Sequence, residues 1–167
     1  MGRPPPRVAR VRGVQVVELL DRLSVAGPAW IGGGWGVDAL VGRQTRPHAD
    51  LDLAVEADHL AGMLEVLDDL GFVVAVDWLP VRVELVHPDG RRVDLHPLHV
   101  EPDGTAVQAG LNGTVFRYAA DGFTTGVVDG HEVNCLSAGQ QLQFRDGYRW
   151  RDVDRHDVAL LRAHLTG

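Results

Sequence analysis

The stretch WIGGGWGVD at residues 30–38, followed by ADLDL at residues 49–53, carries the most informative pattern in this chain. Three consecutive glycines between an apolar run and a helix-like run let the backbone approach a ligand closely, and the helix that follows offers unpaired amides to a phosphate. In the second stretch, Asp50 and Asp52 alternate with leucine, so a strand places both carboxylates on one face, roughly 6.5 to 7 Å apart. Two carboxylates arranged in this way can hold divalent cations.

Each of these two features also has a simpler explanation. A glycine run is most often a plain turn, and an alternating acid and apolar pair is usually the solvated face of an edge strand. Their order is more informative than either feature alone, because a glycine turn, a short helix and an Asp-x-Asp strand follow one another within residues 30–53. We therefore expect a nucleotide site that combines backbone amides with paired carboxylates.

Composition favours a single domain with a sizeable core. The chain has 167 residues, of which 45% are hydrophobic, and this length leaves little room for a second domain. All 16 basic residues are arginine, and the formal charge of −7 disfavours general binding to nucleic acid. Cys135 is the one cysteine, and no run approaches the roughly 20 apolar residues that span a bilayer. We expect a cytoplasmic protein with no membrane partner.

Hydrophobic periodicity and turn signals predict alternating helices and strands. Residues 1–12 are rich in proline and arginine and are expected to form a flexible basic arm before a domain of residues 13–167. Helices are expected at residues 14–23, 35–41, 57–70, 138–145 and 155–164, the last with Asp152 or Asp154 as its cap. Strands are expected at residues 29–31, 51–55, 72–76, 81–86, 92–96, 115–118, 124–128 and 132–135, and residues 101–113 are expected to form a loop with short strands at most.

A predicted hairpin brings further polar residues together. The segment of residues 81–86 alternates strictly, so Arg82 and Glu84 share a face of one strand. The turn signal at residues 88–90 joins it to a strand in which Asp94 and His96 share a face. Asp94 lies among apolar neighbours, where burying an acid without a task is costly. We therefore expect Asp94 to be a third carboxylate beside Asp50 and Asp52, although a structural pairing with an arginine is the alternative.

The stretch of residues 30–53 resembles the antibiotic nucleotidyltransferases, in particular the small lincosamide enzymes and the aminoglycoside 2''-adenylyltransferases. The resemblance extends through residues 78–85 and 93–98, which look more like the lincosamide group. It implies an α+β nucleotidyltransferase fold of the polymerase β type, with a mixed sheet, flanking helices and a single domain. It also implies transfer of a nucleoside monophosphate, with ATP as the expected donor, to a hydroxyl of a small antibiotic.

The resemblance and the residue chemistry together assign roles at the site. Two Mg²⁺ ions are expected to be held by Asp50, Asp52 and Asp94, because magnesium prefers hard oxygen ligands. Asp94 also resembles the third acid of the family, which accepts the proton of the hydroxyl, and Glu84 is the second candidate for this base. The nucleoside triphosphate is expected to contact a set of residues around the glycine turn: Gly33, Gly34, Trp35, Arg46 and His48. For Arg46 the alternative is a surface arginine, and for His48 a capped loop histidine.

The acceptor pocket is expected to contain Trp78, Arg82, Glu84 and His96. An aromatic wall with few acids suits a lincosamide better than an aminoglycoside, whose ammonium groups need several carboxylates. Aminoglycoside 2''-adenylylation and a non-catalytic, antitoxin-like member of the fold are the alternatives, and the sequence leaves a homodimer open. A zinc site at His96 and His99 is disfavoured, because no further ligand stands at the required spacing.

Overall fold

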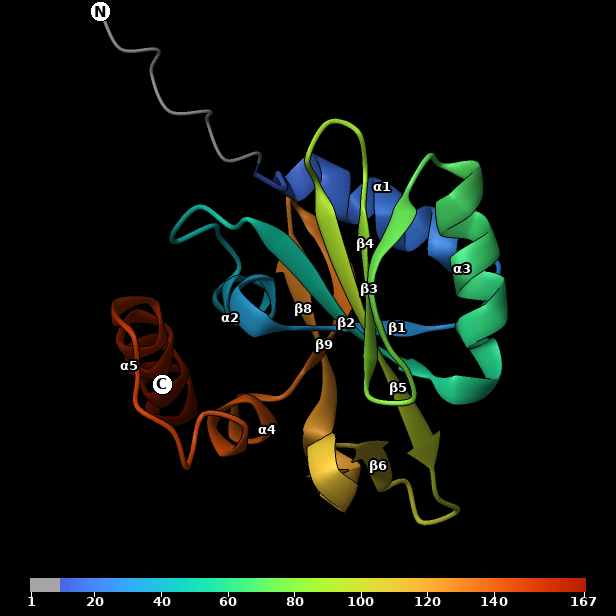
Figure 1. Cartoon of the computed structure of the whole chain (residues 1–167). Coiled ribbons are helices and arrows are strands. Elements are labelled where there is room, and N and C mark those ends of the chain that lie inside the picture. Colours follow the sequence, from blue (N-terminus) through green and yellow to red (C-terminus); the bar gives the residue numbers. More distant parts are fainter. Residues whose placement is uncertain (1–9) are drawn as a thin grey trace, which may run out of the picture.

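The computed structural model describes residues 10–167, and its centre is a mixed β-sheet. The strands are Ala29–Gly32 (β1), Asp50–Glu56 (β2), Val73–Trp78 (β3), Arg82–Val86 (β4), Arg92–Val100 (β5), Ala106–Ala109 (β6), Val115–Tyr118 (β7), Phe123–Val128 (β8) and His131–Leu136 (β9). The main path of the sheet follows the order β3-β4-β5-β2-β1-β9-β8 (Figure 1). The pairs β2–β5 and β1–β9 are parallel, while β1–β2, β3–β4, β4–β5 and β8–β9 are antiparallel. The strands β6 and β7 form a hairpin that pairs with the end of β5.

Five α-helices flank this sheet in the described part of the chain: Gly13–Leu23 (α1), Gly33–Val41 (α2), Leu60–Asp69 (α3), Ala138–Gln143 (α4) and Asp152–Thr166 (α5). Short 3-10 turns occupy Ala57–His59 (η1), Leu111–Gly113 (η2) and Ala120–Gly122 (η3). The helices α1 and α3 lie together on one side of the sheet, and α2, α4 and α5 gather on the other (Figure 1). Within residues 10–167, none of the helices combines the length and the apolar character needed to cross a bilayer.

Three hydrophobic cores stabilise this arrangement in the described part of the chain. One joins α2, α4 and α5 through Val37, Ala138 and Leu161, and the other two, a larger and a smaller one, position the sheet and the site. The larger core packs one apolar face of the sheet against α1 and α3, whose inward residues include Leu19, Leu23, Met63 and Leu67. The smaller core lies under the β6–β7 hairpin and consists of Ala54, Leu98, Ala106, Tyr118 and Leu136. The smaller core fixes the hairpin against the end of β5, which becomes important for the site below.

The structure confirms the expected α+β fold with a mixed sheet, flanking helices and a single domain. The turn between β4 and β5 is the expected tight one, in which the Gly90 N–H donates to the His87 carbonyl oxygen at 2.8 Å. Several bounds differ. The expected loop of residues 101–113 contains β6, which has too few residues to produce a clear period. The last helix begins at Asp152 rather than 155, and Asp154 sits inside its first turn, where its carboxylate accepts from the Arg151 N–H at 2.9 Å.

The expected basic arm lies mostly outside the described residues, since residues 1–9 are not among them. At its end, however, Val11 is only 1% exposed and joins the larger core. The Val11 N–H also donates to the His48 carbonyl oxygen at 2.9 Å. The packed domain therefore begins before residue 13. The sequence did not predict this, because a single valine in a proline-rich and arginine-rich segment gives no hydrophobic period.

Candidate active site

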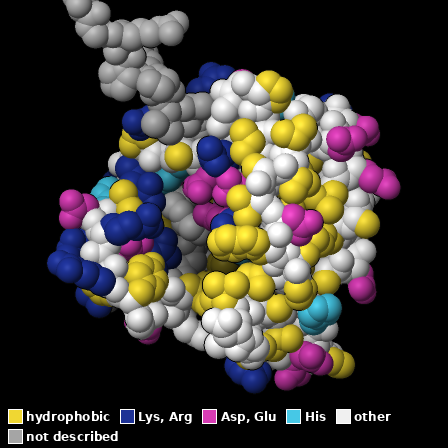
Figure 2. Space-filling view, viewed as in Figure 1, with side chains coloured by type: hydrophobic (Ala, Val, Ile, Leu, Met, Phe, Trp, Pro, Cys, Tyr) yellow, Lys and Arg dark blue, Asp and Glu magenta, His cyan; other side chains and the backbone are white. Residues whose placement is uncertain are grey.

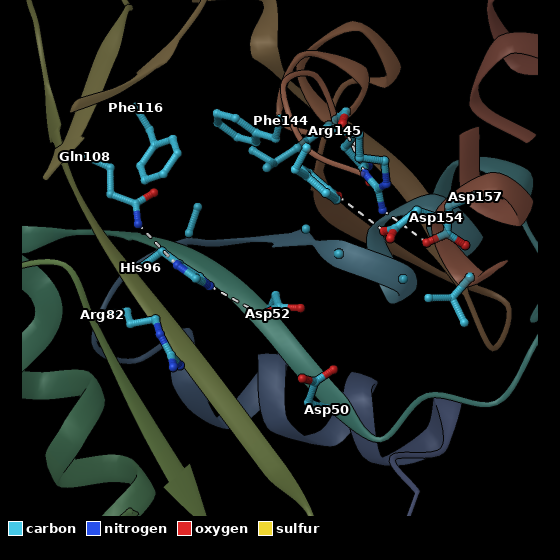
Figure 3. A pocket seen from close by; sticks show the side chains of 18 of the residues that line it. Asp50, Asp52, Arg82, His96, Gln108, Phe116, Phe144, Arg145, Asp154 and Asp157 are labelled. Atoms are coloured by element: carbon cyan, nitrogen blue, oxygen red, sulfur yellow. Dashed lines mark hydrogen bonds and ion pairs between the residues drawn. The ribbon is translucent and has the colours of Figure 1, made fainter. Parts of the chain in front are cut away.

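Strand register brings the acids together. The parallel pairing of β2 and β5 places Asp52 directly beside Asp94, and the antiparallel pairing of β4 and β5 places Glu84 on the other side of Asp94. Residues directly opposite on neighbouring strands share a face of the sheet, so the three carboxylates form a row across it. Asp50 lies two residues before Asp52 and on the same face of β2. Both side chains point into one cavity (Figure 3).

Two acids of this row, Asp52 and Asp94, form a tight group with His96. One ligand atom from each of the three residues lies within 4.8 Å of the others. The His96 Nε2 is 3.3 Å from Asp52 Oδ1 and 3.8 Å from Asp94 Oδ2. Asp50 is outside this group but adjoins it along β2, and we call the four residues together the acidic cluster.

The negative charge of the acidic cluster is incompletely compensated. Burial, together with the charges of Asp52 and Asp94, raises the pKa of Asp50 to about 6. Burial also raises the pKa of Asp94, although His96 and Arg82 oppose this effect. Burial lowers the pKa of His96, but its hydrogen bond to Asp52 and the charges of Asp52 and Asp94 outweigh this and leave the pKa above its ordinary value.

One carboxylate oxygen of the cluster is buried without a hydrogen bond. Asp94 Oδ2 accepts from Arg82 Nη1 at 2.8 Å, whereas Asp94 Oδ1 has no partner among the described residues. Such an atom is costly unless something else satisfies it. A group of carboxylate oxygens with surplus negative charge fits a hard divalent cation such as Mg²⁺. The residues that would hold this cation are Asp50, Asp52 and Asp94.

The glycine turn lies against these acids. Gly33 begins α2 with a φ of +59°, which favours glycine, and a Cβ at this position would collide with the Asp52 carboxylate. A Cβ on Gly34 would overlap the side chains of Arg46 and His48. Both glycines line the cavity, so the backbone at the start of α2 approaches the space beside the acids, as the sequence predicts for a phosphate contact.

A second charged group faces the acidic cluster, and we call Arg46, Arg145 and Asp157 the arginine cluster. Asp157 accepts hydrogen bonds from Arg46 Nε at 3.0 Å and Arg46 Nη2 at 2.9 Å, and from Arg145 Nη2 at 3.1 Å. Asp157 is 2% exposed. Two guanidinium groups share one carboxylate, so the cluster keeps a net positive charge beside the cavity that all three residues line.

Two of the predicted nucleotide-binding side chains point into the interior instead of the cavity. Trp35 is 3% exposed and joins the larger core, and the His48 ring packs against it at 4.7 Å between centroids. His48 Nε2 is 2.6 Å from Asp38 Oδ2. The placement of Trp35 differs from the predicted contact, because the helical path of α2 turns it inward. His48 is held by Asp38 beneath the glycine turn, which fits a supporting role or a capped loop histidine and not a direct phosphate contact. Arg46 does line the cavity, but its fork is occupied by Asp157.

The cavity has a volume of about 940 Å³ and three kinds of wall. In Figure 2 acidic side chains lie on one side of the hollow and arginine side chains on the other, with hydrophobic side chains below them. The apolar wall is formed by Trp78, Val81, Leu111, Phe116, Tyr118, Leu136 and Phe144. The cavity therefore offers sites for cations, for anions and for an apolar group side by side.

Among the predicted acceptor residues, Trp78, Arg82 and His96 line the cavity and Glu84 does not. The Arg82 guanidinium stacks over the Trp78 ring at 4.7 Å. Glu84 is turned toward Arg92 Nη1 at 2.6 Å and Arg82 Nη1 at 3.6 Å. Asp94 also lies just behind the lining, next to Asp52, Arg82 and His96.

The sequence suggests that the segment of residues 101–113 borders the substrate, but it assigns no role to individual residues of the opposite wall, which β6, β7, α4 and α5 supply. Its residues include Gln108, Phe116, Tyr118, Phe144 and Arg145. The strand β6 is four residues long, and Arg145 and Asp157 stand on separate segments whose contact depends on tertiary packing. A buried glutamine in an apolar alternation, such as Gln108 between Val107 and Ala109, was the one signal available.

Comparison with known proteins places this geometry in a family. The family described as aminoglycoside-2''-adenylyltransferase matches residues 14–161. The chain is 32% identical over 148 residues to a lincosamide resistance protein from Staphylococcus haemolyticus, a match that covers 89% of this chain and 91% of that protein. The chain therefore belongs to the aminoglycoside-2''-adenylyltransferase family, within the antibiotic nucleotidyltransferases, and it is a nucleotidyltransferase.

Solved structures agree with this placement. The lincomycin-bound crystal structure of the lincosamide adenylyltransferase LnuA matches with a TM-score of 0.84 and 31% identity, covering 93% of this chain and 99% of that one. The crystal structure of ANT(2'')-Ia in complex with adenylyl-2''-tobramycin matches with a TM-score of 0.70 and 22% identity, covering 90% and 89% of the two chains. The second likeness concerns the fold alone.

Proposed function

We propose that this protein transfers AMP from ATP to a hydroxyl group of a lincosamide antibiotic, with Mg²⁺ as the cofactor. The observation that carries the proposal is the division of one cavity into an acidic wall, an arginine wall and an apolar aromatic wall. A nucleotidyl transfer needs these three environments, since it brings together cations, a triphosphate and an uncharged acceptor group. The similarity to a lincosamide resistance protein and to a lincosamide adenylyltransferase supports the same reaction class.

The reaction exchanges one bond to phosphorus for another. The acceptor oxygen bonds to the α-phosphorus, the bond from that phosphorus to the bridging oxygen of the β-phosphate breaks, and pyrophosphate leaves with that oxygen. Two magnesium ions held by Asp50, Asp52 and Asp94 would neutralise charge on the phosphates and activate the attacking oxygen. The backbone amides at the start of α2 and the excess positive charge of the arginine cluster suit the triphosphate on the opposite side.

Asp94 is a better candidate than Glu84 for the base that takes the hydroxyl proton. Asp94 Oδ1 is free of hydrogen bonds among the described residues, and its raised pKa favours proton acceptance. Neither acid is part of the cavity lining, but Glu84 is engaged by two arginines, Arg92 and Arg82, and lies farther from Asp52, beyond Asp94 in the sheet. Asp94 would approach the acceptor once Arg82, which lines the cavity and covers one of its oxygens, turns aside.

The walls of the cavity favour a lincosamide over an aminoglycoside. Besides Asp50 and Asp52, the lining acids are Asp154 and Asp157, and both are already paired with arginine. An aminoglycoside carries several ammonium groups that need free carboxylates, whereas a lincosamide has a largely apolar half that suits Trp78 and Phe116. The family name keeps aminoglycoside 2''-adenylylation as the second candidate.

A matrix of donors and acceptors tests the proposal. Purified protein with Mg²⁺ is incubated with ATP, GTP, CTP or UTP and with lincomycin, kanamycin or no acceptor, and pyrophosphate release and product mass are measured. We expect pyrophosphate and an adenylylated product only with ATP and lincomycin. Adenylylated kanamycin in the absence of any lincomycin product would establish the second candidate and reject the first.

A further inference from the structure

A line of hydrogen bonds leads from the β6–β7 hairpin through His96 to Asp52 (Figure 3). Gln108, which is 5% exposed, stands at its centre. Its amide nitrogen Nε2 is 3.1 Å from the Val81 carbonyl oxygen and 3.2 Å from His96 Nδ1. Its Oε1 accepts from the Tyr118 hydroxyl at 2.6 Å.

The Val81 carbonyl determines which way the Gln108 amide faces. A backbone carbonyl oxygen only accepts hydrogen bonds, so the amide atom beside it has to be the NH₂ group. The opposite orientation would place two carbonyl oxygens about 3 Å apart, where they repel each other and the Val81 oxygen loses its donor from Gln108. Tyr118 agrees with this orientation, because its hydroxyl donates to the remaining amide oxygen.

This orientation in turn selects the tautomer of His96. The Gln108 NH₂ group has two hydrogens, one directed at Val81 and one at His96, and it has no lone pair to offer. His96 Nδ1 must therefore accept, and the ring proton of a neutral imidazole lies on Nε2, which faces Asp52 Oδ1 at 3.3 Å. A proton on Nδ1 would point at the amide hydrogens of Gln108, so the contact geometry favours Nε2 as the protonated nitrogen of the neutral ring.

We propose that Gln108 is a positioning residue that holds His96 as its Nε2–H tautomer, so that His96 donates a hydrogen bond to Asp52 and is not itself a metal ligand. This inference rests on the proposed metal-dependent transfer. It gives His96 a role that its proximity to the two carboxylates does not reveal, since the three residues together resemble a ligand set. An imidazole that keeps its proton on Nε2 has no lone pair there for a cation.

The consequence is a site that presents oxygen ligands alone. Magnesium favours hard oxygen donors, whereas an available imidazole favours zinc and other borderline metals. The β6–β7 hairpin carries Gln108 and Tyr118 and is held by the smaller core. The line of hydrogen bonds that leads to Asp52 therefore has a rigid support. Tyr118 stacks on Phe123 and packs edge-on against Phe144, which keeps its hydroxyl in place.

Nitrogen NMR of the histidine side chains tests the inference on the wild-type protein without any substrate. Long-range ¹⁵N–¹H correlation spectra distinguish a protonated from an unprotonated ring nitrogen, and comparison with His96→Asn assigns the His96 signals. The spectra are recorded at a pH at which the His96 ring is neutral, and we expect a protonated Nε2 and an unprotonated Nδ1 there. A neutral ring with its proton on Nδ1 overturns the proposal.

The variant Gln108→Met tests whether Gln108 is the cause. We expect both ring nitrogens of His96 to move toward averaged shifts, and the affinity for Mn²⁺, measured by electron paramagnetic resonance as a probe for the magnesium site, to fall about 10- to 100-fold. Gln143→Met is the matched control, because Gln143 is more exposed and lines no part of this cavity. An unchanged His96 spectrum in Gln108→Met overturns the proposal.

A second substitution covers the case in which Gln108→Met fails to fold. Gln108→Glu replaces the donor with an acceptor of the same shape, so we expect a proton on Nδ1; an unprotonated Nδ1 in this variant contradicts the inference. The NMR and Mn²⁺ measurements need neither ATP nor antibiotic. Failure of the proposed function, seen as no turnover with any donor and acceptor, is therefore distinguishable from failure of this inference.

Discussion

The acidic cluster and the arginine cluster face each other across one cavity, yet they differ in how their charges are satisfied. Asp157 accepts three hydrogen bonds from Arg46 and Arg145, so its buried carboxylate is fully engaged within the protein. Asp94 leaves one oxygen without a partner among the described residues, and the pKa of Asp50 is raised by burial and by the neighbouring acids. A buried charge whose hydrogen bonds are all made within the protein indicates a structural role. A buried charged oxygen that has no hydrogen-bond partner indicates a site for a ligand. The two clusters should therefore respond differently to the same aspartate-to-asparagine change.

The largest effect is expected for Asp52→Asn in the acidic cluster. An amide keeps the shape of the side chain but offers no negative charge to a cation. Loss of several kcal/mol of charge stabilisation corresponds to roughly a 10³-fold or greater loss of transfer rate. Pyrophosphate release at saturating Mg²⁺ measures the rate, and circular dichroism checks that the fold is intact.

The matched control is Asp69→Asn, an exposed aspartate at the end of α3, away from the cavity. It should transfer at the wild-type rate. If Asp52→Asn kept more than about a tenth of the wild-type rate, the assignment of Asp52 to the metal site would be wrong. A tenfold loss of rate is about 1.4 kcal/mol, which is too small for a carboxylate whose charge should stabilise the transition state by several kcal/mol.

A somewhat smaller effect is expected for Asp94→Asn. Removing a general base typically lowers the rate about 10²- to 10⁴-fold, and ATP binding should change little, because the glycine turn and the arginine cluster remain. Steady-state kinetics separate the loss in kcat from the KM for ATP. Glu84→Gln is the comparison, and it should have a small effect. A large loss in Glu84→Gln with unchanged kcat in Asp94→Asn would move the base to Glu84.

The arginine cluster should respond in stability. Asp157→Asn removes the one carboxylate between two guanidinium groups, and breaking a buried ion pair costs roughly 3 to 5 kcal/mol of the free energy of unfolding. The lower end is expected, because Arg46 keeps 22% of its side chain exposed and water can solvate it. Urea unfolding measures the difference.

The same helix supplies the control for this stability change. Asp152→Asn disrupts an exposed ion pair with Arg155 in the first turn of α5, and such pairs contribute about 0.2 to 1 kcal/mol. If Asp157→Asn were no more destabilising than Asp152→Asn, the arginine cluster would not be a structural element, and its charge would have to serve the ligand alone.

This contrast also explains what the sequence reveals. Alternation within β2 predicts the pair Asp50 and Asp52, and alternation within β5 predicts the pair Asp94 and His96. The juxtaposition of the two pairs, which the parallel pairing of β2 with β5 produces, was implied by the family resemblance and not by a local pattern. The arginine cluster joins Arg46 to residues about one hundred positions later, and no local pattern encodes that contact. Trp35 follows the glycine turn but faces the interior, because the geometry of α2 sets its direction, while His48 lies outside any helix and is held inward by Asp38.

The smallest effect, and one of opposite sign, is expected for the stability of Asp50→Asn in the metal-free protein. In the folded state the pKa of Asp50 is about 6, above its ordinary 3.8, so the folded protein retains a proton that the unfolded chain has already released. The contribution of Asp50 to the free energy of unfolding must therefore decrease as pH rises from about 4 to about 6, and this cost persists at higher pH.

Removing that carboxyl should stabilise the protein at pH 8 by on the order of 1 kcal/mol, less than the pKa shift alone implies, because Asp50 is crowded by protein atoms yet keeps contact with water, which screens its charge. Urea unfolding with a chelator should show this gain at pH 8 and a smaller one at pH 4.5. Asp69→Asn removes a carboxylate that lies away from the acidic cluster, so it tests whether the loss of any carboxylate gives the same gain.

Added Mg²⁺ should stabilise the wild type more than Asp50→Asn, and so narrow or reverse the difference in stability between them. Equal stability of the two proteins at pH 8, with and without Mg²⁺, would mean that Asp50 feels no uncompensated charge, and the proposed contrast between the two clusters would fail at its acidic side.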